Sequence, residues 1–425
     1  MRSVDEQLAR VTEAARVPDP VRIAIAESLG LMCAEEVQAT RPLPSFDQAA
    51  IDGYAVRAVD IGGERGLATP APQEKAQRPQ PRETSLPVVG EVAAGSQKPL
   101  RLQPKQAVRV HTGAPMPALA DAVIPLEWTD RGRKRMVAHR TVRSGEFVRR
   151  AGDDIRVGDV AVQSGSLIGP THIGLLAAVG REKVLAYPRP RVSIFSVGHE
   201  LVDIHRDPGL GHVYDVNSYA LAAAAREAGA DAHRVGIIAG EPRRLREIIE
   251  AEMVRSEVMV ITGAVGGSGS ENIRKVLEEL GTIDTTRVAM HPGSVQGFGL
   301  LGPEEKPVFL LPSNPVSALV IFEIFIRPVI RMSLGKRNGT RKMVRARSLN
   351  HVRSKNGRRG YVRARLMRDA ETQDYLVEGL GAATGAPAHL LAGMANANAL
   401  LKIPEGVVEV RPGDIVEVIF LAQSR

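Results

Sequence analysis

The sequence predicts an α/β fold joined to β regions, and three observations carry this prediction. Strand-like and helix-like runs alternate over residues 191–335, short alternating strands fill residues 336–425, and residues 41–142 are rich in Pro and Gly with short β-type runs. Alternating strands and helices are typical of a parallel, doubly wound sheet with helices on both faces. The C-terminal strands indicate a small β-barrel or sandwich.

The alternating region can be followed in chain order. We expect a strand at RVSIFSVG, a helix at SYALAAAAREAG, a strand at AHRVGII, a helix opened by Pro242, a strand at VMVITG, a helix at ENIRKVLEELG, strands at RVAMHPG and PVFLLP, and a long helix from Val316 to Ile330. Glu323 and Arg327 interrupt this last helix, so it is too charged and too short to cross a bilayer. Ligands of such sheets bind beyond the carboxyl ends of the strands.

The first part of the chain is organised differently. Helical patterns at Ser3–Ala15 and Thr171–Ala178 bracket the β-rich residues 41–142. We therefore expect the β region to be inserted between two halves of one domain.

Composition narrows the class of protein. The net charge is +8, but aromatic residues make up only 4%, so nucleic acid is not an expected partner. The single Cys33 excludes an internal disulfide framework and a cysteine zinc cluster. The charged start MRSVDEQLAR shows no secretory signal, and we expect a cytoplasmic protein without direct membrane insertion.

The most informative loop follows the strand that ends at Thr262. It reads TGAVGGSGS and opens a helix at Glu271, an arrangement that can bring backbone amides against a phosphate or oxyanion. No Lys follows its last Gly, so it is not a Walker-type loop, and the dinucleotide pattern GxGxxG is also not met. A tight turn without a ligand is the structural alternative.

Motifs along the whole chain resemble one family. AAIDGYAVRAVD, GEVAAG, VRVHTGAPMPALADAVIP, VRRAGDDI, SVGHEL, YDVNS, TGAVGGSG, HPGSVQGFG and LLPSNPVSA occur in the order and spacing of the molybdopterin molybdenumtransferase family. This family includes bacterial MoeA and the E domain of gephyrin. The resemblance covers essentially the full length of the chain.

The resemblance implies an elongated architecture of four subdomains. These are a split linker subdomain (1–40 and 143–185), an inserted β subdomain (41–142), a doubly wound molybdopterin-binding α/β subdomain (186–335) and a C-terminal β-barrel (336–425). Family members form elongated homodimers, with the active site between the α/β subdomain of one chain and the inserted subdomain of the other. We expect the same assembly here.

The resemblance also implies a reaction. Adenylylated molybdopterin and molybdate give molybdenum cofactor and AMP, with Mg²⁺ as the cation. Hard oxygen ligands suit Mg²⁺ at a phosphate anhydride, while cations and backbone amides would hold the molybdate dianion.

The family motifs assign site residues in this sequence. The expected catalytic residues are Asp52, Thr112, Asp154, Glu200 and Glu271, and the expected metal ligands are Asp52, Glu200 and Glu271. Expected substrate-binding residues are Thr262, Gly263, Gly266, Gly267, Ser268, Asp215, Asn217, His291, Ser294, Pro312, Ser313, Asn314, Pro315 and Arg363. Each also has a structural alternative, such as an Asx turn for Asp52 before Gly53 or a helix-start position for Glu200.

The sequence departs from the family at several of these positions. The family's STGDE reads SVGHE at 196–200, SGGVS reads TGAVG at 262–266, KPGKP reads HPGSV at 291–295, and the family Asp after the glycine loop is Glu271. The paired serines expected in the barrel fall in GAPAHLL, which has none. Two cations of the KPGKP loop are thereby lost, and His291 replaces one only when it is protonated.

These departures support a second hypothesis. Gephyrin's E domain is a dimeric scaffold that binds a segment of membrane receptors, and gephyrin associates with tubulin. By analogy, this chain could bind a peptide from a tubulin-like cell-division protein or a membrane receptor, with weakened or lost catalysis. Retained Asp52, Thr112, Asp154 and Glu200 favour the enzyme over the scaffold.

Overall fold

The computed structural model describes residues 1–63, 83–98, 100–238, 242–266, 270–336, 339–380 and 391–421. The chain forms two compact units. The first consists of Met1–Val21, Gly30–Met32 and Ala186–Arg425, and the second of Arg22–Leu29 and Cys33–Leu185. The finer division into four subdomains stays a prediction.

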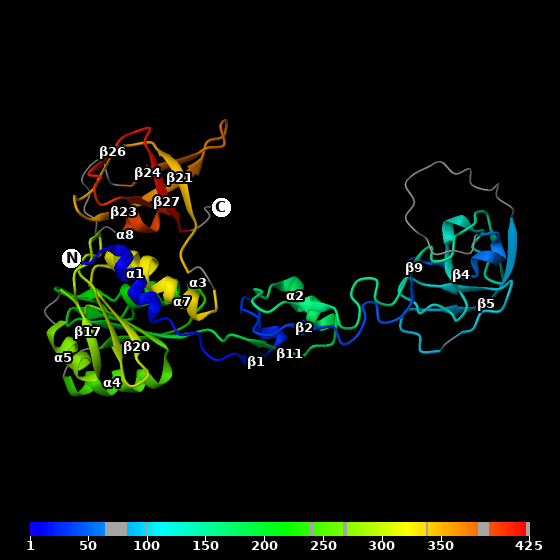
Figure 1. The fold of residues 1–425 in the computed structure, drawn as a ribbon, viewed down its shortest axis with the longest axis horizontal. Helices are drawn as coiled ribbons and strands as arrows, with labels where there is room; N and C mark the ends of the chain where they lie inside the picture. The colour runs from blue at the N-terminus through cyan, green and yellow to red at the C-terminus, as the bar shows by residue number, and fades with distance from the viewer. Residues whose placement is uncertain are drawn as a thin grey trace. The chain divides into compact units, whose positions relative to one another are not determined.

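The first unit contains a six-stranded mixed sheet (Figure 1). Its strands, in spatial order, are β15 (Asp231–Ile238), β12 (Arg191–Val197), β16 (Val258–Thr262), β20 (Lys306–Leu311), β19 (Gly297–Leu301) and β17 (Gly281–Asp284). The first four are parallel, as predicted, but β19 and β17 run antiparallel to their neighbours. The prediction of a wholly parallel sheet was therefore wrong at this edge.

The error comes from residues 281–301. The predicted strand RVAMHPG is reduced to β18 (Met290–His291), which pairs with the C-terminal domain instead of this sheet. Pro292 lacks the N–H that a ladder needs, and Gly293 has a φ of +97°, so the strand stops there. The real edge strands, GTID and GFGLL, are short and glycine-containing, a weak strand signal.

Helices cover both faces of the sheet, as predicted. α3 (Asn217–Ala228), α1 (Val4–Glu13) and the long helix after β20 pack on one face, while α4 (Pro242–Arg255) and α5 (Ser270–Leu280) pack on the other. Alternation within the central strand β16 explains this, since Val258 and Val260 join the first core and Met259 and Ile261 the second. A strand buried on both faces reads as continuously apolar.

The long helix is present but not uniform. It begins as α6 (Pro315–Ile321), widens to one π-helical stretch at Phe322–Ile326, and ends as α7 (Arg327–Ser333). Pro328 cannot donate an intrahelical hydrogen bond, and a π-stretch one turn before it is a common way to accommodate that loss. Among the described residues, no helix has the length and apolar character needed to cross a membrane.

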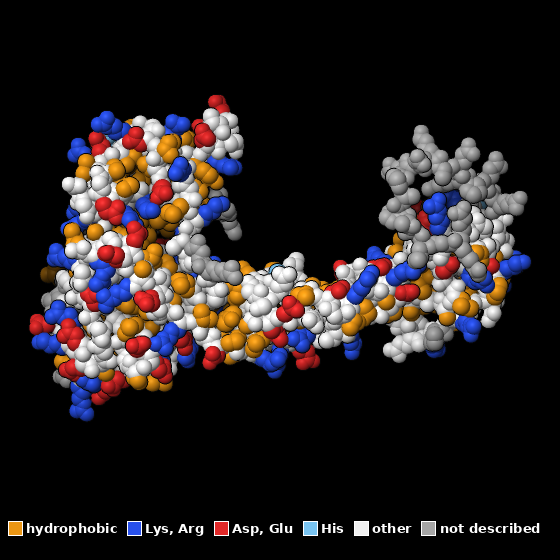
Figure 2. Space-filling model, viewed as in Figure 1, with side chains coloured by type: hydrophobic (Ala, Val, Ile, Leu, Met, Phe, Trp, Pro, Cys, Tyr) orange, Lys and Arg blue, Asp and Glu red, His pale blue; other side chains and the backbone are white. Residues whose placement is uncertain are grey.

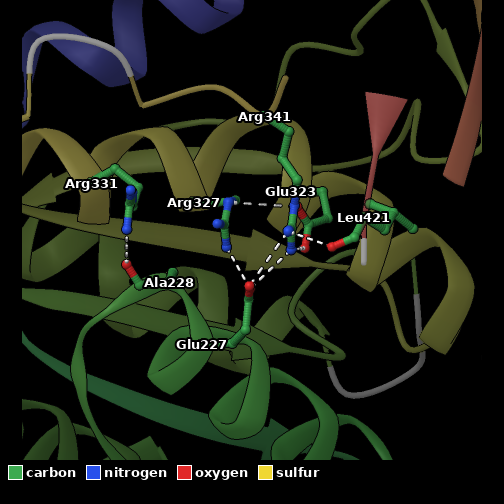
Figure 3. Close-up of polar contacts among 7 residues, drawn as sticks. All are labelled: Glu227, Ala228, Glu323, Arg327, Arg331, Arg341 and Leu421. Atoms are coloured by element: carbon green, nitrogen blue, oxygen red, sulfur yellow. Dashed lines mark hydrogen bonds and ion pairs between the residues drawn. The ribbon is translucent and has the colours of Figure 1, made fainter. Parts of the chain in front are cut away.

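A buried ion network ties this helix to α3 and to the chain leading into the C-terminal domain (Figure 3). Arg341 Nε lies 2.7 Å from Glu323 Oε2 and its Nη2 lies 2.9 Å from Glu227 Oε2, while its Nη1 contacts the Leu421 carbonyl. Arg327 also pairs with Glu227. The Glu323, Arg327 and Arg341 side chains are only 10–13% exposed, so their charges depend on one another.

The C-terminal domain is a closed barrel, which decides between the barrel and sandwich alternatives. β23, β24, β21, β27 and β25 pair in that order, and β25 pairs back to β23. Their bounds are β21 (Met343–Ser348), β23 (Arg359–Arg368), β24 (Tyr375–Gly379), β25 (Ala399–Ile403) and β27 (Ile415–Phe420), with the short β22 (Val352–Arg353), α8 (Leu391–Ala395) and β26 (Glu409–Val410) between them. The β18 strand extends this barrel sheet beside β23.

The second unit contains a five-stranded sheet in the order β7-β4-β6-β5-β8. Its strands are β4 (Gly53–Val56), β5 (Thr84–Val92), β6 (Ala107–Val110), β7 (Ala122–Pro125) and β8 (Arg135–Ala138). Short strands before and after this sheet pair with each other: β2 (Val37–Gln38) with β10 (Val160–Val162), and β3 (Gln48–Ala49) with β9 (Val148–Arg149). Beside them lie α2 (Pro170–Ala178) and the pair β1 (Val21–Ala24) and β11 (Lys183–Ala186).

The surface charge is mixed. On the face shown in Figure 2, basic and acidic side chains of the described residues are interspersed. This distribution differs from the continuous basic face that nucleic-acid binding favours.

Candidate functional site

Four loops meet at the carboxyl edge of the sheet in the first unit. Loops follow β12, β16 and β20 at this edge because the three strands are parallel. Residues 285–296, between β17 and β19, join them because Gly297 at the start of β19 lies opposite Leu310 near the end of β20. This is the edge at which the sequence analysis expects ligands to bind.

A cavity of about 690 Å³ opens at this edge. It is formed by the loops after β12 and β20, including the two-stranded pair β13 (Leu201–Val202) and β14 (Val213–Tyr214). Six of the predicted site residues line it: Glu200, Asp215, Asn217, Ser313, Asn314 and Pro315. A cavity of this size suits a drug-sized or cofactor-sized ligand.

Asp215 is the most constrained of these residues. Its carboxylate is 1% exposed and accepts hydrogen bonds from Ser196 Oγ at 2.7 Å, from the Ser218 N–H at 3.1 Å and from the Ser218 hydroxyl. Ser196 Oγ in turn lies 3.0 Å from Thr262 Oγ1, at the end of β16. Asp215 and Thr262 thus hold the ends of two strands and the start of α3 in one network.

The opposite wall is equally fixed. Asn217 Nδ2 donates to the Ser313 carbonyl at 2.7 Å, and Asn314 Oδ1 accepts the Ser317 N–H at 2.9 Å as the N-cap of α6. Pro315 occupies the first helical position, where its missing N–H costs nothing. Pro312, just before them, is half-buried at the end of β20. The motif LPSNP therefore forms a rigid wall of the cavity.

At the same edge, glycines let neighbouring backbone and side-chain atoms approach more closely than a Cβ would allow. A Cβ on Gly263 would lie 1.9 Å from the Val197 carbonyl oxygen, and its φ is +75°. A Cβ on Gly198 would lie 2.8 Å from a Glu200 carboxylate oxygen, so Glu200 folds back over this glycine. Gly266 has a φ of +79° and lies beside Val295 of the neighbouring loop. The predicted residues Gly267 and Ser268 lie outside the described residues.

The loop containing His291 and Ser294 is half-buried. Burial lowers the pKa of His291, and the nearby charges of Lys355 and Arg358 lower it further, so this imidazole is neutral near pH 7. Ser294 is 8% exposed, and its hydroxyl has no hydrogen-bond partner within the described part of the chain. The segment from His291 to Val295 carries no cation of its own at neutral pH.

Glu271 and Arg363 stand apart from the cavity lining. Glu271 is exposed on the first turn of α5, and a hydrogen bond from Lys275 at 3.1 Å lowers its carboxylate pKa. Arg363 on β23 is 7% exposed, and a Cβ on Gly393 would lie 3.0 Å from its Nη1, so α8 covers this guanidinium. Burial lowers the pKa of Arg363.

The second unit holds the remaining predicted residues. Asp52 Oδ1, just before β4, accepts the Thr112 N–H at 2.7 Å and the Thr112 hydroxyl at 2.9 Å, and these bonds lower the pKa of Asp52. Both side chains are exposed, in contrast to Asp215. Asp154 is also exposed, and its N–H donates to the Leu43 carbonyl at 2.9 Å. Asp52 and Thr112 are thus brought together across 60 residues of sequence.

Two residues near Asp52, His111 and Glu91, were not among the predicted site residues. His111 Nε2 lies 2.7 Å from Glu91 Oε1, and its Nδ1 lies 3.9 Å from Asp52 Oδ2. Both residues stand inside the motifs GEVAAG and HTGAP that carried the family resemblance, so position within a motif was the available signal. Only the pairing of β4 with β6, and of β6 with β5, shows that they adjoin.

The metal ligands expected from the sequence are divided between the two units, with Asp52 in the second and Glu200 and Glu271 in the first. No group of three or more His, Cys, Asp or Glu side chains in the described ranges could hold a metal ion. Asp52 uses one oxygen on Thr112, and Glu271 pairs with Lys275. Magnesium binding by these residues stays a prediction.

Three family models match the chain. The MoeA N-terminal region (domains I and II) matches residues 2–180, a probable molybdopterin-binding domain matches residues 193–332, and the MoeA C-terminal region (domain IV) matches residues 345–421. With the doubly wound sheet, the carboxyl-edge cavity and the closed barrel in place, the chain belongs to the MoeA family of molybdopterin molybdenumtransferases.

Particular relatives are similar over the full length. "Molybdopterin molybdenumtransferase 1" of Mycobacterium tuberculosis is 57% identical over 424 residues, covering 100% of both chains. "Molybdopterin molybdenumtransferase 2" of the same species is 35% identical, covering 98% of this chain and 99% of the relative. The solved structure of the molybdopterin biosynthesis MoeA protein from Pyrococcus horikosii aligns with a TM-score of 0.78 at 29% identity, covering 99% of each chain.

Proposed function

We propose that this protein is a molybdopterin molybdenumtransferase that inserts molybdate into adenylylated molybdopterin and releases AMP. The observation that carries the proposal is the cavity at the carboxyl edge of the sheet, which six motif residues of the family line. A relative that is 57% identical over the whole chain is a molybdopterin molybdenumtransferase.

The residues described above suggest separate tasks. The rigid wall at Ser313–Pro315 and the Asp215 network would fix the walls against which the pterin lies. The tight loop from Gly263 to Gly266 allows backbone to approach a phosphate without a Cβ in the way. Glu200 and Asp52 are exposed carboxylates available for proton transfer or for a cation that arrives with the substrate.

Magnesium is part of the proposal as a companion of the substrate. Mg²⁺ is commonly held by one or two carboxylates together with substrate phosphates and water. Because the described residues form no three-ligand group, we assign no catalytic step to a metal held by this chain alone. Chelation with EDTA, followed by readdition of Mg²⁺, tests whether turnover requires the cation.

The reaction itself is the decisive experiment. The purified protein is mixed with adenylylated molybdopterin, molybdate and Mg²⁺, and AMP release and activation of an apo-molybdoenzyme are measured. Glu200→Gln should lower turnover because it removes one charge from the cavity lining, whereas Glu371→Gln, at an exposed site in the barrel, should not. Wild-type protein that releases no AMP would refute the proposal.

A scaffold function is the second candidate. The specific observation behind it is that the loop from His291 to Val295 carries no cation for a dianion, since the buried imidazole is neutral. A scaffold would bind a peptide of a tubulin-like cell-division protein or a membrane receptor without AMP release. Deletion that impairs cell division while molybdoenzyme activity persists would favour this function over the enzyme.

We also propose that the active form is a cytoplasmic homodimer. Light scattering on the eluted protein should give a mass of about twice 45.7 kDa. A monomer at the concentrations used for turnover would contradict this part of the proposal alone.

A further inference from the structure

A turn of the barrel lies beside the segment His291–Val295, which carries no cation of its own. β18 pairs with β23 in parallel, with His291 opposite Gly360, and the Arg359 N–H donates to the Ala289 carbonyl at 2.9 Å. The five residues before β23, 354–358, therefore emerge next to His291. This turn contains Lys355 and Arg358.

The cations of this turn differ from the next one along the chain. Arg359, the first residue of β23, pairs with Asp5, at 2.7 and 2.8 Å, and with Glu405, at 2.9 Å. Lys355 and Arg358 have no carboxylate within 4.0 Å among the described residues. Lys355 is exposed and Arg358 half-buried. Both cations are thus available to a ligand.

Their position is set relative to His291. The pairing of β18 with β23 places the turn beside this histidine, and the charges of both residues, added to burial, lower its pKa. The neutral imidazole can still donate or accept one hydrogen bond, but it contributes no charge. Positive charge at this point of the loop therefore comes from the barrel.

Two buried hydroxyls near this junction lack partners in the part of the chain that the structure describes. They are Ser294 Oγ, in the loop itself, and Ser354 Oγ, which would lie 2.6 Å from a Cβ on Gly360, opposite His291. A buried hydroxyl without a partner destabilises the fold. An oxyanion bound here would supply acceptors for such hydroxyls.

We propose that Lys355 and Arg358 bind the oxyanion substrate, molybdate in the proposed reaction, at the junction of the His291–Val295 loop and the barrel turn. The inference rests on the proposed function for the identity of the ligand. The barrel then contributes substrate affinity as well as stability. Its cations act on ground-state binding, so their removal raises the KM for molybdate more than it lowers kcat.

The test compares two double variants of equal charge change. Lys355→Gln/Arg358→Gln removes the two turn cations, and Arg345→Gln/Arg347→Gln removes two exposed cations from β21 of the same barrel. Molybdate binding is measured by calorimetry on the full chain without pterin, and the KM for molybdate is measured with it. We expect the turn variant to weaken molybdate binding about tenfold at low salt, and the β21 variant to leave it unchanged.

The salt dependence sharpens the result. At about 1 M salt the Debye length falls to about 3 Å, so the gap between wild type and the turn variant should shrink if charge is the cause. Lys355→Arg should retain binding. Equal molybdate affinity in the wild type and the turn variant, or equal losses in the two double variants, would overturn the inference.

The outcome separates the two proposals. Molybdate binding that depends on the turn, without AMP release, would support the anion site and refute the proposed enzyme. AMP release with a KM that ignores the turn would support the enzyme and refute the anion site.

Discussion

Asp215 and Asp52 make nearly the same hydrogen bonds in opposite environments. Each accepts the N–H and the hydroxyl of one residue, Ser218 in the first case and Thr112 in the second. Asp215 is 1% exposed, whereas the Asp52 side chain is 53% exposed. Burial decides how much stability is lost when either carboxylate is replaced. Donors in the core are left without an acceptor, whereas donors at the surface can hydrogen-bond to water instead.

Substitutions at these two aspartates are expected to affect different properties of the protein, folding stability at Asp215 and function at Asp52. Changes in the Asp215 network alter folding and the cavity together, so a loss of activity there cannot be assigned to contact with substrate. Changes at Asp52 leave the fold intact and so report on function. The four predictions below use this contrast.

Asp215→Ala should have the largest effect on stability. It removes the acceptor of the Ser218 hydroxyl and N–H inside the core and leaves Ser196 Oγ with Thr262 Oγ1 alone, and we expect a loss of about 3 kcal/mol in the free energy of unfolding. Urea denaturation followed by circular dichroism measures it. Asp215→Asn keeps one acceptor oxygen and should lose less, and equal stability of Asp215→Ala and wild type would contradict the proposed network.

Glu323→Gln extends the contrast to a buried ion network. Among the described residues, Arg341 and Arg327 would keep the half-exposed Glu227 as their only carboxylate partner, and we expect a loss of about 2 kcal/mol in the free energy of unfolding (Figure 3). Glu278→Gln breaks the exposed pair with Arg274 and should cost less than about 0.5 kcal/mol. If both variants lose the same amount, burial is not the deciding factor.

Asp52→Asn should have little effect on stability and a large effect on activity. Its exposed position predicts a stability change within about 0.5 kcal/mol, while the proposed function predicts a 10- to 100-fold lower rate of AMP release, roughly the loss seen for a ligand-orienting carboxylate. Steady-state AMP release and urea denaturation on the same preparation measure the two quantities. The exposed Glu36→Gln in the same unit is the control, and undiminished AMP release by Asp52→Asn would remove Asp52 from the catalytic set.

The same contrast explains what the sequence could predict. The four parallel strands, the helices on both faces and the LPSNP wall follow from local patterns, because strands buried on two faces read as apolar runs and Asn-Pro is a helix-start signal. The antiparallel edge strands β17 and β19 could not be predicted from local patterns, because short glycine-containing strands depend on their neighbours for stability.

Site residues divide in the same way. Asp215 and Asn217 could be placed from a motif, but the Glu91–His111 contact beside Asp52 could not, because only the pairing of strands 20 residues apart creates it. The cations at His291 were also missed, since they come from the barrel about 60 residues later in the chain. Charges that act across a strand pairing leave no local pattern in the sequence.

The smallest predicted effect concerns His291, an intermediate case between the two aspartates. Its pKa is lowered in the folded state by burial and by Lys355 and Arg358, relative to about 6.5 in the unfolded chain. Between the folded pKa and 6.5 the unfolded state binds more protons, so this group destabilises the fold as the pH falls below 6.5. His291→Gln should therefore reduce the difference in unfolding free energy between pH 7.5 and pH 5.5.

His205→Gln removes an imidazole that is 83% exposed, and it is the control for the loss of a histidine as such. An unchanged pH dependence in His291→Gln would show that the barrel cations do not act on this loop, and would weaken the anion site along with it.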